Sequence, residues 1–218
     1  MKGKHMGKFD TEDKIEQVRK EWQNADFQEV HRLAREKVLR NLRELNGFYI
    51  VKTGHGFVRF VEERMKTPES ICGKLERKGY DLDFETAVEE LNDISGVRCI
   101  CHSVKEIYWI ARQIGKDDRF EVLKVKDYVR KPKKNGYESY HIIMNVPVKR
   151  GKKEEAVRVE LQLRTLIMDA WASMDNRICY KKGETVPPQV QRQIEKYAKI
   201  GRHLDKLIER GMEAASGQ

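Results

Sequence analysis

Apolar residues in the first part of the chain recur at the spacing of an amphipathic helix. The positions are Ile15, Val18, Trp22, Ala25, Val30, Leu33, Ala34, Val38, Leu42 and Leu45. This pattern predicts a helix over residues 12–45. The glycines that follow, Gly47, Gly54 and Gly56, are expected to end it.

The next helices are marked by the residues at their ends. Thr67 is a good N-cap and Pro68 suits a first helical turn, so a helix is predicted to begin there. Gly79 is a natural residue to follow its last turn. A second helix is predicted from about Asp83 to Asn92.

Four β-rich segments from residue 97 onward predict strands. They span residues 97–101, 119–129, 140–146 and 157–163. Helical spacing returns over residues 104–114, after Thr165, and after Pro187-Pro188 as far as about Met212. This order of elements predicts one α+β domain with a central sheet of four or five strands.

The composition indicates that the protein binds anionic partners. The 218 residues are 39% hydrophobic and 36% charged, with a formal net charge of +9. Nucleic acids, nucleotides and anionic membranes all fit this charge. No apolar run approaches the roughly 20 residues of a membrane span, and the basic N-terminus lacks the apolar core of a secretory signal. A cytoplasmic location is therefore expected.

The strand predicted at residues 157–163 has two different faces. Its valines and leucines point one way, whereas Glu160, Gln162 and Arg164 share the other side. For an isolated strand, a solvated face would explain this pattern. A ladder of charge and amide in the middle of a sheet is also suited to a binding site.

A second acid stands where another strand begins. Asp93 ends a helix and leads through Gly96 into the strand at residues 97–101. It could simply cap or turn the chain. Paired with Glu160 across adjacent strands, it could instead hold Mg²⁺, a hard ion that binds one or two carboxylates together with phosphate oxygens.

A group of basic residues surrounds the helix start at Thr67-Pro68. Arg64 and Lys66 precede the helix, and Lys74 and Lys78 lie one turn apart on its body. Ser70 lies in the first turn. The exposed N–H groups of a helix start attract phosphate, and these cations would strengthen that attraction. A basic, solvated helix is the alternative.

A basic loop over residues 131–139 leads into the strand that contains His141. Asn135-Gly136 forms a tight turn, after which Tyr137 could stack on a nucleobase. An ordinary hairpin with a packing tyrosine, and a structural histidine, are the alternatives for these residues.

Four segments together resemble the synthetase domain of RelA/SpoT-type stringent-response enzymes. They are ERMKTPESICGKLERKG, LNDISGVRCIC, KKNGYESYH and VELQLRTLIMDAWASMDNRICYKKG, and they occur in the family's order. The resemblance covers roughly residues 45–182, and the flanking helices are similar to those of single-domain small alarmone synthetases.

The resemblance implies a nucleotidyltransferase-like mixed sheet of about five strands, flanked by helices. It implies one synthetase domain over residues 1–218, with a catalytic core at about 45–182 and helical extensions at 10–45 and 187–213. The implied reaction is Mg²⁺-dependent transfer of pyrophosphate from ATP to the 3′-hydroxyl of GDP or GTP. Since none of the six histidines is followed by Asp, the hydrolase motif of long relatives is not expected.

The family's motifs also imply a role for each matching residue. Asp93 and Glu160 would bind the metal, and Glu160 would serve as general base. ATP would be bound by Arg64, Lys66, Ser70, Lys74, Lys78 and Arg98. The acceptor nucleotide would be bound by Lys133, Asn135, Tyr137, His141, Gln162 and Arg164.

The chain departs from the family pattern at two places. Asp175-Asn176 stands where the family commonly has Glu-His, and Glu138 stands where a basic or amide residue is usual. An acid after Tyr137 is expected to place negative charge near the phosphates and to weaken or shift acceptor binding.

Other functions remain open from the sequence. A toxin-type relative would use the same donor site to pyrophosphorylate tRNA 3′ ends, and a silent module would only bind nucleotides or RNA. The resemblance further implies a homotetramer and a regulatory nucleotide or RNA as an additional ligand. Neither DNA nor a membrane is expected as a partner.

Overall fold

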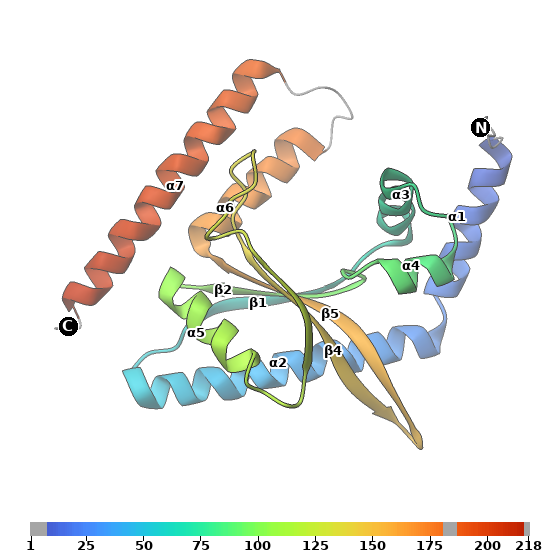
Figure 1. The fold of residues 1–218 in the computed structure, drawn as a ribbon, viewed down its shortest axis with the longest axis horizontal. Coiled ribbons are helices and arrows are strands. Elements are labelled where there is room, and N and C mark those ends of the chain that lie inside the picture. The colour runs from blue at the N-terminus through green and yellow to red at the C-terminus, as the bar shows by residue number, and fades with distance from the viewer. Residues whose placement is uncertain (1–7, 181–186, 216–218) are drawn as a thin grey trace.

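A single five-stranded sheet organises the protein. The computed structural model describes residues 8–180 and 187–215. The strands are β1 (Val58–Met65), β2 (Ser95–Cys101), β3 (Glu121–Asp127), β4 (Tyr140–Arg150) and β5 (Lys153–Thr165). They lie in the order β1-β2-β5-β4-β3, which puts β5 in the centre (Figure 1).

The sheet is mixed, as the resemblance implies. β2 and β5 run parallel, with Gly96 opposite Glu160 and Arg98 opposite Gln162. The pairs β1·β2, β4·β5 and β3·β4 are antiparallel. The predicted α+β class is confirmed, and the basic turn around Gly151 joins the two longest strands.

Seven α-helices surround the sheet within the described ranges. They are α1 (Lys8–Trp22), α2 (Ala25–Thr53), α3 (Pro68–Lys78), α4 (Phe84–Glu90), α5 (Val104–Ile114), α6 (Leu166–Asp175) and α7 (Pro188–Ala215). A π-helical turn, Asn176–Tyr180, extends α6. Figure 1 shows α2 and α5 on one side of the sheet, α1, α3 and α4 gathered at one end, and α6 and α7 at the other.

The main core lies between the sheet and the two helices α2 and α5. One face of β5 supplies Val157, Val159, Leu161 and Leu163 to this core. Residues such as Val38 of α2 and Ile110 of α5 pack against them and are fully buried. Because this face is apolar throughout, the polar side chains of β5 are left on the opposite face.

The N-terminal helical segment differs from the prediction in two ways. It is two helices, because the side chain of Asn24 caps a new helix by accepting bonds from the backbone N–H groups of Asp26 and Phe27. The second helix also passes through Gly47 and ends only at Gly54, whose φ is +81°. A single helical glycine costs about 1 kcal/mol, which packing of the surrounding turns outweighs.

Strand β1 was not predicted from the sequence. Its register shifts between Val58 and Phe60, so the alternation of apolar and polar residues is broken there. Most of its residues are exposed or half-buried, which removes the hydrophobic signal that marked the other strands.

Among the described residues, no helix has the length and apolar character needed to cross a membrane.

Candidate functional site

The candidate site is built on the polar face of the central strand β5. Glu160, Gln162 and Arg164 lie on this face, as the period-two pattern predicts, and each is at most 8% exposed. The register puts Gln162 between Arg98 on β2 and His141 on β4. Three neighbouring strands therefore bring their polar side chains to one place.

Glu160 is held by two hydrogen bonds, one to each carboxylate oxygen. Nδ1 of His141 lies 3.0 Å from Oε1, and Nε2 of Gln162 donates to Oε2 at 2.7 Å. Burial would raise the pKa of Glu160, but His141 and the bond from Gln162 outweigh it and hold the pKa below its usual value. The carboxylate is therefore ionised at neutral pH and able to accept hydrogen bonds.

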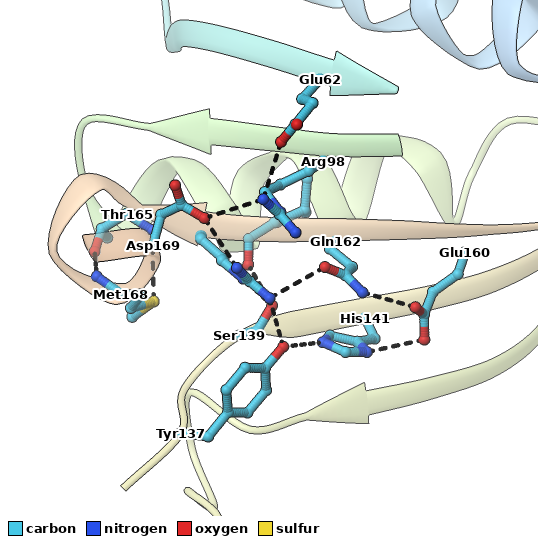
Figure 2. Close-up of polar contacts among 12 residues, drawn as sticks. Glu62, Arg98, Tyr137, Ser139, His141, Glu160, Gln162, Thr165, Met168 and Asp169 are labelled. Atoms are coloured by element: carbon cyan, nitrogen blue, oxygen red, sulfur yellow. Dashed lines mark hydrogen bonds and ion pairs between the residues drawn. The ribbon is translucent and has the colours of Figure 1, made fainter. Parts of the chain in front are cut away.

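The network continues from Glu160 to the loop before β4 (Figure 2). Nε2 of His141 lies 2.9 Å from the hydroxyl of Tyr137, and Nη2 of Arg164 donates to that hydroxyl at 2.8 Å. Arg164 also donates to Oε1 of Gln162 at 3.1 Å. Because ionised Glu160 can only accept, Nδ1 of His141 is the donor to it.

Asp93 forms the second acidic centre, together with two lysines. Its carboxylate oxygens lie 3.1 Å from Nζ of Lys66 and 2.8 Å from Nζ of Lys74. Burial alone would raise the pKa of Asp93, yet the two lysines lower it to about 2. The charge of Asp93 opposes the ionisation of Glu160, but it is the weakest of the effects on that group, and the pKa of Glu160 stays below its usual value.

Of the other donor-side residues predicted from the sequence, Arg64 and Ser70 lie near the start of α3, whereas Lys78 lies at its far end. Arg64 lies on β1 opposite Gly96 of β2, and its side chain lies over the glycine backbone. Ser70 lies in the first turn, and its hydroxyl accepts from that of Thr67 at 3.1 Å. Lys78 lies at the far end of the helix, with Nζ 5.0 Å from the centre of the Tyr80 ring.

Arg98 is fixed by two acids. Its Nη1 lies 2.9 Å from Glu62 on the exposed edge strand and 3.6 Å from Oδ1 of Asp169 in α6. The same oxygen of Asp169 accepts from Nη1 of Arg164 at 2.9 Å. Asp169 thus lies between a guanidinium of β2 and one of β5. Figure 2 shows its contact with Arg98.

The loop before β4 gathers the remaining predicted residues. Nζ of Lys133 lies 4.7 Å from the ring centre of Tyr137. Asn135 accepts from the backbone N–H of Tyr137 at 3.2 Å and donates to Asp175 at 3.4 Å. One of the two positions that depart from the family motif, Asp175, thereby contacts this loop directly.

Two comparisons decide the family. A family model for the region found in RelA/SpoT proteins matches residues 63–185, more than half of the chain. The GTP pyrophosphokinase YwaC of Bacillus subtilis is 34% identical, over 90% of this chain and 92% of its own length. The chain belongs to the RelA/SpoT family. GTP pyrophosphokinase YjbM of the same organism is 29% identical, over 86% of each chain.

Solved structures of the RelA/SpoT family share the fold. Small alarmone synthetase 2 from Bacillus subtilis superposes with a TM-score of 0.78 at 33% identity, covering 88% of this chain and 99% of that one. Small alarmone synthetase 1 from the same organism, bound to its product pppGpp, gives a TM-score of 0.80 at 28% identity, covering 88% and 98%.

The RelA/SpoT motifs did not reveal every residue of the site. Asp169 contacts both Arg98 and Arg164, but an acid in the first turn of a helix is also expected simply to favour the helix dipole. Tyr128 was missed as well, although its ring lies 5.4 Å from that of His141. Only the tertiary arrangement distinguishes these residues from ordinary helix and loop positions.

The expected effect of Glu138 is wrong in its premise. Its side chain is 8% exposed and turned toward α7, away from the residues predicted to bind nucleotides. There Nε of Arg202 donates to its carboxylate at 2.6 Å. The negative charge is therefore paired within the protein.

Proposed function

We propose that this chain synthesises (p)ppGpp for the stringent response by transferring pyrophosphate from ATP to the 3′-hydroxyl of GDP or GTP. The observation that carries the proposal is the register of the sheet: Gly96, three residues after the lysine-paired Asp93, stands opposite Glu160. The GTP pyrophosphokinases and alarmone synthetases among its relatives support it.

The donor site is proposed where β1, α3 and β2 meet. Its residues are Arg64, Lys66, Ser70, Lys74, Lys78 and Arg98. Lys66 and Lys74 neutralise Asp93 in the free protein, so they are well placed to turn to the phosphates of ATP. The planar guanidiniums of Arg64 and Arg98 come from paired strands and suit stacking on adenine.

The acceptor site is proposed on the other side of Glu160. Its residues are Lys133, Asn135, Tyr137, His141, Gln162 and Arg164. The half-buried ring of Tyr137 would stack on guanine, while the chain of bonds through His141 fixes its hydroxyl. The cations near this ring would attract the acceptor's phosphates.

The two acids suit Mg²⁺, which prefers oxygen ligands and usually takes one or two carboxylates plus phosphate oxygens and water. No cluster of three or more acidic, histidine or cysteine ligands occurs among the described residues, so the remaining ligands would come from substrate and solvent. Asp93 and Glu160 are proposed to hold the ion, which when bound supplies positive charge to the triphosphate.

In the proposed reaction the 3′-oxygen of the acceptor forms a bond to the β-phosphorus of ATP. The bond from that phosphorus to the oxygen bridging the α-phosphate breaks, and AMP leaves with this oxygen. Glu160 takes the proton of the hydroxyl. Positioning and charge neutralisation by Lys66, Lys74 and Arg98 would supply most of the acceleration.

A homotetramer in the cytoplasm is proposed as the working form. The helix α7 carries an apolar stripe that the described residues leave exposed. It consists of Tyr197, Ile200, Leu204, Leu207 and Ile208, which are 37–57% exposed. Such a stripe suits burial against another copy. Size-exclusion chromatography with light scattering should give four times the mass of one chain.

The deciding experiment is an acceptor panel with ATP labelled at the γ-phosphate and Mg²⁺ present. We expect label on GDP or GTP, with one AMP released per transfer. Label on tRNA alone would favour the toxin-type activity, and no release of AMP would leave a binding module. The Glu160→Gln variant serves as the blank for each acceptor.

A further inference from the structure

The helix α7 lies against the loop that carries Tyr137, although it supplies none of the residues assigned to either nucleotide. Figure 1 shows α7 running beside α6, at the end of the sheet where this loop lies. Three positions on α7, Ile194, Ala198 and Arg202, are four residues apart and therefore share one face.

Arg202 holds the residue that follows Tyr137. Its Nε donates to Oε1 of Glu138 at 2.6 Å, and its Nη2 forms an ion pair with the same oxygen. Glu138 is 8% exposed, so Arg202 is the group that compensates for removing its carboxylate from water. The hydrogen-bonded ion pair joins a helix to a loop 64 positions away in the chain.

Ala198 packs against Gly136, the residue that precedes Tyr137. Gly136 has a φ of +91°, and a Cβ built on it would lie 2.4 Å from Cβ of Ala198. Only glycine allows the backbone to approach the helix this closely in this conformation. The loop is therefore in contact with α7 immediately before and immediately after Tyr137.

A third contact reaches Tyr137 through a tryptophan. The indole N–H of Trp171 donates to the carbonyl oxygen of Ile194 at 3.1 Å. The Trp171 ring packs edge-on against the Tyr137 ring, with centroids 6.2 Å apart. The α7 face formed by Ile194, Ala198 and Arg202 thus contacts the surroundings of the tyrosine ring. Arg164 and His141 hold its hydroxyl from the sheet.

We propose that Arg202 is a positioning residue for the acceptor nucleotide, acting through Glu138 to hold the Tyr137 ring in place. The inference rests on the proposed function, because it takes Tyr137 as the residue that stacks on guanine. It assigns to α7 a role in acceptor binding in addition to the self-association proposed above. The donor site lies beyond Glu160 and should be little affected.

The test is steady-state kinetics of Arg202→Gln with ATP and the preferred guanine acceptor varied separately. Losing the partner of a buried carboxylate should raise the acceptor KM roughly ten- to hundredfold. The KM for ATP should stay within about twofold, since Lys66, Lys74 and Arg98 are untouched. Equal losses for both substrates, or an unchanged acceptor KM, would overturn the proposal.

A double variant separates positioning from general damage. Adding Glu138→Gln to Arg202→Gln removes the unpaired buried charge, so the double variant should bind the acceptor better than Arg202→Gln alone. If the two substitutions weakened acceptor binding additively, the proposed coupling of Arg202 and Glu138 would be contradicted. The exposed ion pair of Lys149 and Glu154 at the hairpin tip supplies the matched control: Lys149→Gln should leave both KM values unchanged.

Two further measurements keep the test decisive. Should Arg202→Gln fail to fold, Arg202→Lys keeps the charge but offers a single donor direction, and its acceptor KM should rise roughly fivefold; an unchanged value would refute the role. If wild type releases AMP and the Arg202 variants have the same acceptor KM as wild type, this inference alone is refuted. Wild type that releases no AMP with any guanine nucleotide would sink the proposed function itself.

Discussion

The carboxylate of Glu160 and the imidazole of His141 meet at 3.0 Å across two adjacent strands, and both side chains are buried. The contact orients the carboxylate and favours its ionised form. An oriented, ionised carboxylate can accept a hydrogen bond from a hydroxyl brought to it by the substrate, and its lowered pKa makes it a weaker base than an ordinary glutamate.

The first prediction concerns the proposed role of Glu160 as proton acceptor. Glu160→Gln keeps the shape of the side chain but removes its basicity, so kcat should fall by roughly 10²–10⁴-fold or below detection. Binding of ATP and acceptor, measured by calorimetry, should be largely retained, because Asp93 and the lysines around it are untouched. Glu155→Gln, the same substitution at an exposed position of β5, is the matched control and should retain full activity. An active Glu160→Gln protein would end the assignment.

The second prediction separates the two functions of Tyr137. Tyr137→Phe keeps the ring but loses the hydroxyl that joins Arg164 to His141. We expect a modest rise in acceptor KM with a several-fold drop in kcat, because His141 loses its partner. Tyr137→Ala should also lose stacking, roughly 1–3 kcal/mol of acceptor binding.

The comparison of these two variants is the decisive measurement. If phenylalanine and alanine were equally impaired in acceptor KM, the ring would not be stacking on the base.

Much of the site could be predicted because it follows from local rules. Period-two alternation placed Glu160, Gln162 and Arg164 on one face, and the Thr67 cap fixed where α3 begins. The motif order then joined these segments into one family. Strand periodicity and cap chemistry depend on neighbours a few residues away, which a sequence displays directly.

The rest depends on contacts between distant segments. Glu138 was expected to face the nucleotides, but its partner Arg202 lies on a helix whose position the motifs do not encode. Asp169 could not be recognised because its role comes from two arginines on different strands. The bulge in β1 likewise follows from pairing with β2 and leaves no periodic pattern.

The third prediction tests Asp169 as the acid shared by the two arginines. Asp169→Asn leaves Arg98 and Arg164 close together without this counter-charge, and each repels the other. The repulsion should move Arg98 and raise the KM for ATP roughly three- to tenfold. Asp118→Asn, at an exposed site, should have no effect. An unchanged KM for ATP would show that Glu62 alone holds Arg98.

The last prediction concerns pH and the buried acid Asp205 of α7. Burial raises its pKa from 3.8 to about 6, although the hydroxyl of Thr165 donates to it at 2.9 Å. The folded state therefore binds the proton more tightly than the unfolded state does. The resulting stabilisation is present in full below about pH 4 and is lost as the pH rises through about 6.

Asp205→Asn cannot titrate, so its stability relative to wild type should improve by roughly 1–3 kcal/mol between pH 4 and pH 8. Chemical denaturation of both proteins at each pH measures this difference, with Asp81→Asn as the exposed control. A constant difference across the range would mean that Asp205 keeps an ordinary pKa in the folded protein.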